Sequence, residues 1–94
     1  MFFITQVEPH KDGTFIAQCR GYFSNFDDAE YRVVNNITDF WETCFDYIVI
    51  ENTPEGLYQS PLAVAWYKYN KELDKYQKIN PPQFAKNRSG FALG

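Results

Sequence analysis

The stretch from Arg20 to Glu42, RGYFSNFDDAEYRVVNNITDFWE, constrains the fold most, because it reads as a β-strand running into a capped amphipathic helix. Ser24 or Asn25 supplies the N-cap, and acids in the first turns complement the positive end of the helix dipole. Apolar residues then recur at three- and four-residue steps, which predicts one buried helix face. These residues are Phe26, Ala29, Val33, Ile37, Phe40 and Cys44.

The weak point of this helix is the pair Asn35-Asn36, because asparagine disfavours a helix interior. The pattern fits one long helix with a strained middle, or two helices broken at this pair. We favour the single helix.

Strand patterns precede and follow the helix. Residues 2–8 and 14–21 form a predicted hairpin, with Asp12-Gly13 as the turn. Further on, the β-prone segments are 46–51, 62–70 and 75–79, and Pro81-Pro82 ends the last of them. The segment 46–51 is apolar on both faces, which favours a central place in the sheet.

We therefore predict a single α+β domain over residues 1–94, with the chain order β-β-α-β-β-β. Its antiparallel-dominated sheet has four or five strands, and one long helix packs on one face. Several strands are apolar on both faces, so something must cover the second face. The candidates are the C-terminal tail and a second copy of the chain, and the uncovered face favours a homodimer or a partner-binding face.

The charges are distributed unevenly. The net charge is −3, but residues 1–60 hold ten acids and three bases, while residues 61–94 hold two acids and six bases. No Lys or Arg lies between Arg32 and Lys68. The acids Asp39, Glu42 and Asp46 fall in this span and form a predicted acidic face for binding a protein partner. The alternative is a solvated surface.

The residues that usually carry catalysis are sparse. The single histidine, His10, lies in a predicted turn, and the cysteines Cys19 and Cys44 have no metal-ligand spacing. We expect both thiols to be reduced and buried. Acid pairs such as Asp27 with Glu30 share a helix face, but acids are ordinary at a helix start. We therefore expect no catalytic residue, no metal site and no cofactor, and predict that the chain is not an enzyme.

Aromatic and basic residues alternate in the last predicted hairpin, and we predict a ligand- or partner-binding surface there. Its residues are Trp66, Tyr67, Lys68, Tyr69 and Lys78. Such a surface could stack a nucleobase and pair with phosphates, whereas packing within the domain or a dimer is the plainer alternative. At net charge −3 we expect no specific binding to duplex nucleic acid. No run approaches the roughly 20 apolar residues of a membrane span, so we expect no membrane partner.

Several segments together resemble a group of short uncharacterised proteins of low-GC Gram-positive bacteria and their phages and prophages. They are GYFSNFDDAEYRVVNNITD, DYIVIE, the loop Glu55–Tyr58, WYKY at 66–69 and the final FALG. The resemblance implies a cytoplasmic accessory protein, in keeping with small phage proteins that inhibit host factors, including defence systems. It carries no catalytic signature.

Two functions follow as expectations. The first is a non-enzymatic phage- or prophage-type protein that binds and inhibits a host protein. The alternative is a homo-oligomer that sequesters a small nucleotide, held by the aromatic-basic hairpin.

Overall fold

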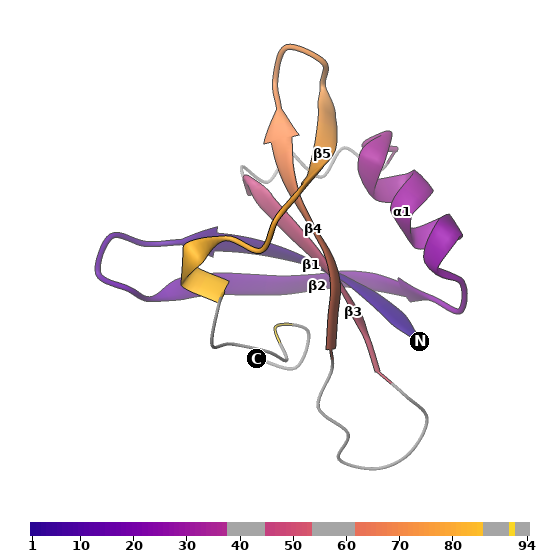
Figure 1. Cartoon of the computed structure of the whole chain (residues 1–94), viewed down its shortest axis with the longest axis horizontal. Helices are drawn as coiled ribbons and strands as arrows, with labels where there is room; N and C mark the ends of the chain where they lie inside the picture. Colours follow the sequence, from indigo (N-terminus) through magenta and orange to yellow (C-terminus); the bar gives the residue numbers. More distant parts are fainter. Residues whose placement is uncertain (38–44, 54–61, 86–90, 92–94) are drawn as a thin grey trace.

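The computed structural model describes residues 1–37, 45–53, 62–85 and 91. These residues form an antiparallel five-stranded sheet with one α-helix (Figure 1), which confirms the predicted α+β class. The elements are β1 (Phe2–Pro9), β2 (Phe15–Phe23), α1 (Phe26–Val34), β3 (Tyr47–Asn52), β4 (Leu62–Asn70), β5 (Lys75–Ile79) and a short 3₁₀ helix, η2 (Gln83–Ala85). In space the strand order is β2-β1-β3-β4-β5, so the chain order and the sheet order differ.

The β1–β2 hairpin forms as the sequence predicts. Asp12 accepts hydrogen bonds from the backbone N–H of Thr14 at 3.0 Å and from its hydroxyl, and these bonds lower the pKa of the Asp12 carboxyl. Gly13 has a φ of 89°, which favours glycine over other residues. The turn chemistry of Asp12-Gly13 therefore fixes the register of the two strands.

The helix begins where predicted but is much shorter. Asn25 is the N-cap, and its side chain accepts from the backbone N–H of Asp27 at 2.7 Å. The helix ends at Val34 because Asn35 is the C-cap and Asn36 adopts a left-handed φ of 49°. The prediction of one helix continuing through Asn35-Asn36 is therefore wrong.

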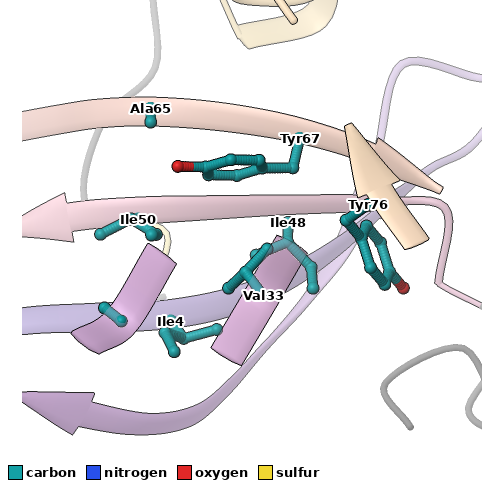
Figure 2. Close-up of a cluster of buried hydrophobic side chains, with 8 residues drawn as sticks. Ile4, Val33, Ile48, Ile50, Ala65, Tyr67 and Tyr76 are labelled. Atoms are coloured by element: carbon teal, nitrogen blue, oxygen red, sulfur yellow. The ribbon is translucent and has the colours of Figure 1, made fainter. Parts of the chain in front are cut away.

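One face of the sheet, called here the Tyr67 face, carries the larger buried cluster (Figure 2). Two residues of α1, Ala29 and Val33, belong to this cluster and are fully buried. The other members come from four strands and are Ile4, Ile48, Ile50, Ala65, Tyr67 and Tyr76. The alternation of side chains along each strand places these residues on one side of the sheet.

The opposite side, called here the Trp66 face, is also covered within the chain. Val7, Val49 and Trp66 form a buried cluster with Ala85 and Phe91 from the C-terminal segment. The backbone N–H of Phe91 donates to the buried Glu51 carboxylate at 3.1 Å. The sequence left two candidates for covering this face, the C-terminal tail and a second copy of the chain. Ala85 and Phe91 of the C-terminal segment cover part of it.

The edges of the sheet carry features that oppose further strand pairing. In the edge strand β2, Arg20 is an extra residue with no partner in β1. Such a bulge bends an edge away from flat pairing. The short β5 exposes Lys75 and Lys78 instead. Joining two sheets edge to edge is thus disfavoured.

Candidate functional site

The predicted aromatic-basic hairpin does not form a single surface. In the register of β4 and β5, Tyr67 lies opposite Lys78 and Tyr69 opposite Tyr76, so these side chains share the Tyr67 face. Trp66 and Lys68 alternate with them and point to the other side. The five residues of this predicted site are therefore divided between two faces of the sheet.

Two of its aromatic rings are also inaccessible. Trp66 is 2% exposed and packs edge-on against Phe84 and Phe91, while Tyr67 is fully buried. A ring enclosed by the core cannot stack on a nucleobase. For Trp66 and Tyr67, the plainer alternative therefore holds, because both rings pack within the domain.

Tyr67 instead links the sheet to the helix. Its hydroxyl donates to the carboxylate of Glu30 in α1, and Lys78 lies 3.7 Å from the same carboxylate. Burial and the bond to Glu30 raise the pKa of the Tyr67 hydroxyl far above its usual range. Glu30, Tyr67 and Lys78 thus form a structural network across the β5 side of α1.

Tyr69 belongs to a second link, between the helix end and the β4–β5 turn. Its hydroxyl donates to Asp74 at 2.6 Å, and the side-chain amide of Asn36 donates to the same carboxylate oxygen at 3.3 Å. Asp74, like Asn36, has a left-handed backbone, with a φ of 51°. The two strained turns are therefore held against each other.

Of the predicted acidic face, Asp39 and Glu42 lie outside the described residues. Asp46 is half-buried just before β3. Its backbone N–H donates to the Glu8 carboxylate at 3.2 Å, and its carbonyl accepts from the Tyr69 N–H at 2.9 Å. The main chain of Asp46 therefore bridges β1 and β4.

A surface that the sequence reasoning missed lies on the β2 side of α1. It is a shallow hollow, called here the Tyr31 hollow, lined by Phe23, Asp28, Tyr31, Arg32 and Ile37. Tyr31 is 61% exposed and Ile37 is 46% exposed. In the sequence, the one indication of this surface is Tyr31, an aromatic residue that lies outside the apolar stripe of the helix.

The polar groups of this hollow are positioned by the fold. The guanidinium carbon of Arg32 lies 5.6 Å from the centre of the Phe23 ring, within the range of a cation–π contact. Asp28 is in the first turn of α1, and its backbone N–H donates to the Asn25 cap at 3.3 Å. The hollow is thus lined by two aromatic residues, one aliphatic residue, one cation and one acid.

The remaining chemistry-bearing residues are dispersed. Cys19 is a free, exposed thiol on β2, so the prediction that it is buried is wrong. Cys44 lies outside the described residues. Among the residues described, no three His, Cys, Asp or Glu side chains gather as metal ligands would.

Comparison with protein-family models, with curated proteins and with solved structures finds no match to this chain. Within the described ranges, no helix has the length and apolar character needed to cross a membrane.

Proposed function

We propose that this chain is a non-enzymatic binding protein that acts by occupying the surface of another protein, with the Tyr31 hollow as its contact site. One observation carries the proposal: two large apolar side chains, Tyr31 and Ile37, are exposed and line the same hollow. Single exposed apolar residues are ordinary, but a group of them within a charged rim is typical of interaction sites.

The composition of the hollow supports this role. Tyrosine and arginine are over-represented among the residues that dominate binding energy at protein interfaces. Tyr31 presents a rigid ring with few rotatable bonds, and Arg32 is already ordered by its contact with Phe23. Binding would therefore cost less side-chain entropy than at a surface of flexible residues.

The charges nearby indicate a basic partner. Asp27 and Asp28 are exposed at the start of α1, and Asp39 and Glu42 follow Ile37 closely in the sequence. Arg32, in the hollow itself, offsets one of these charges, and the chain has no further Lys or Arg from 33 to 67. A partner whose apolar contact is surrounded by Lys or Arg would match this surface, and its association would be faster at low salt.

The biological setting is part of the proposal. The resemblance to phage and prophage accessory proteins supports a cytoplasmic inhibitor directed at a host protein. An inhibitor of this kind needs no catalytic group, because it acts by covering a surface that the host protein uses.

The proposal is tested by capture from host lysate with matched variants. The wild-type chain should retain a specific protein that Tyr31→Ala fails to retain. Tyr22→Ala is the control, because Tyr22 and Tyr31 are both 61% exposed and only Tyr31 lines the hollow. Charge reversal by Asp39→Lys with Glu42→Lys should weaken retention further. Equal retention by wild type and Tyr31→Ala would exclude this site.

The predicted homodimer and the nucleotide alternative gain no specific support. The dimer prediction rested on an uncovered sheet face, and Ala85 with Phe91 lies on that face. The nucleotide alternative relied on the rings of Tyr67, which is buried, and Tyr69, which is half-buried and bonded to Asp74. Sedimentation at high micromolar concentration tests the dimer directly.

A further inference from the structure

A second hollow, called here the Lys68 hollow, lies at the tip of the β4–β5 hairpin, apart from the Tyr31 hollow. It is lined by Lys68, Tyr69, Asn70, Lys71, Glu72, Gln77 and Ile79. Lys68 pairs with Gln77 and Asn70 with Lys75, and side-chain alternation places all four on the Trp66 face.

The side chain of Asn70, which lines this hollow, forms three hydrogen bonds with its neighbours. The Asn70 side-chain oxygen accepts from the backbone N–H of Glu72 at 3.0 Å and of Leu73 at 3.4 Å, which fixes the turn. Its amide group donates to the side-chain oxygen of Gln77 at 3.1 Å. The Gln77 oxygen is therefore used, and its NH₂ group is left as a donor at the hollow.

The two lysines at the hollow are available for a ligand. Lys78 is the only lysine within ion-pair distance of a carboxylate in the part of the chain that the structure describes. The Lys68 ammonium instead lies 5.7 Å from the centre of the Tyr47 ring, a contact that orders the side chain without neutralising it. Lys71 lies in the turn, and Lys75 adds a third positive charge nearby. Two acids of the same turn, Glu72 and Asp74, offset part of this charge.

We propose that the Lys68 hollow binds a small anion carrying two linked phosphate groups, held by Lys68, Lys71 and the Gln77 amide. Two ammonium groups and an amide donor match the several acceptor oxygens of a diphosphate. The hollow is open to water, so binding is weak and falls with salt. Recognition is through charge, because the rings of Trp66 and Tyr67 are buried and the Tyr69 ring packs with Tyr76 on the opposite face.

The test is a titration of the ¹⁵N-labelled full chain with inorganic pyrophosphate at low ionic strength, followed by NMR. Shifts should concentrate in the amides of the β4–β5 hairpin and saturate by about 10 mM. The double variant Lys68→Gln with Lys71→Gln should weaken binding roughly tenfold or more, since it removes both charged donors. Lys11→Gln, in the turn before β2, removes an exposed lysine elsewhere and should leave the affinity unchanged.

The proposal would be overturned by the absence of localised shifts at about 10 mM pyrophosphate. Equal weakening by the Lys11 control, or equal affinity of the double variant and the wild type, would also overturn it. Phosphate should bind more weakly than pyrophosphate, whereas ATP should bind no tighter than its triphosphate group alone. A large gain from the adenosine portion would contradict recognition through charge.

Discussion

The hydrogen bond from Tyr67 to Glu30 joins the sheet to α1, and Tyr67→Phe removes it while keeping the buried ring. Hydrogen bonds to charged groups contribute about 1.5–3 kcal/mol to stability. The Glu30 side chain is 32% exposed and retains Lys78 at 3.7 Å, so the freed carboxylate is hydrated and still paired. We therefore expect a loss near the lower end, about 1.5 kcal/mol.

Urea denaturation at pH 7 measures this change in the free energy of unfolding. Tyr69→Phe is the matched control, because its hydroxyl also donates to a carboxylate, that of Asp74, but the bond is exposed. We expect a smaller loss there, about 0.5 kcal/mol. If Tyr67→Phe costs no more than Tyr69→Phe, the network does not join the helix to the sheet as described.

The same substitution has a signature in pH. The pKa of Tyr67 is raised in the folded chain from an ordinary value of 10.0. Above that pH the unfolded chain loses the Tyr67 proton and the folded chain keeps it, so deprotonation favours unfolding. Wild-type stability should fall relative to Tyr67→Phe by up to about 1.4 kcal/mol per pH unit. A constant difference between the two proteins from pH 9 to 11 would refute the raised pKa.

Substitutions at three further positions test the fold. Phe91→Ala should cost about 3 kcal/mol, because Phe91 is 3% exposed against Phe15 and Trp66; thermal unfolding measures it, and a near-neutral result would mean the segment is not docked. Asn36→Ala should cost about 1–2 kcal/mol more than Asn36→Gly, since only glycine adopts the left-handed backbone freely. Asn25→Ala should cost about 1 kcal/mol through loss of the N-cap, while Asn25→Ser restores most of it. Equal stabilities within either asparagine pair would contradict these assignments.

The strands and the start of the helix could be predicted from sequence because their signals are local. Strand β4 at Leu62–Asn70 and strand β5 at Lys75–Ile79 have the predicted bounds, set by alternation and by flanking turn residues. The central place of β3 also followed from its apolar residues on both faces. Asn25, one of two candidate caps, is the cap observed.

The sequence predictions that were wrong concern features that depend on contacts between distant segments. The helix stops at Asn35-Asn36 partly because Asn36 bonds to Asp74, far along the chain. The cover of the Trp66 face by Phe91 comes from a tail with too little periodic pattern for prediction. Trp66 and Tyr67 looked available for a ligand because composition marks them as aromatic and near lysines but does not report burial. Tyr31 was overlooked because it lies off the apolar stripe.

The most direct test of the proposed function is the affinity of the captured partner, purified and titrated calorimetrically with three forms of this chain. The Tyr31→Ala substitution should weaken binding by roughly 30-fold, the loss expected when an interface residue worth about 2 kcal/mol is truncated. The Tyr22→Ala control, altered at a residue equally exposed but outside the hollow, should bind within about threefold of wild type. Unchanged affinity in Tyr31→Ala, or an equal loss in both variants, would contradict the Tyr31 hollow as the contact site.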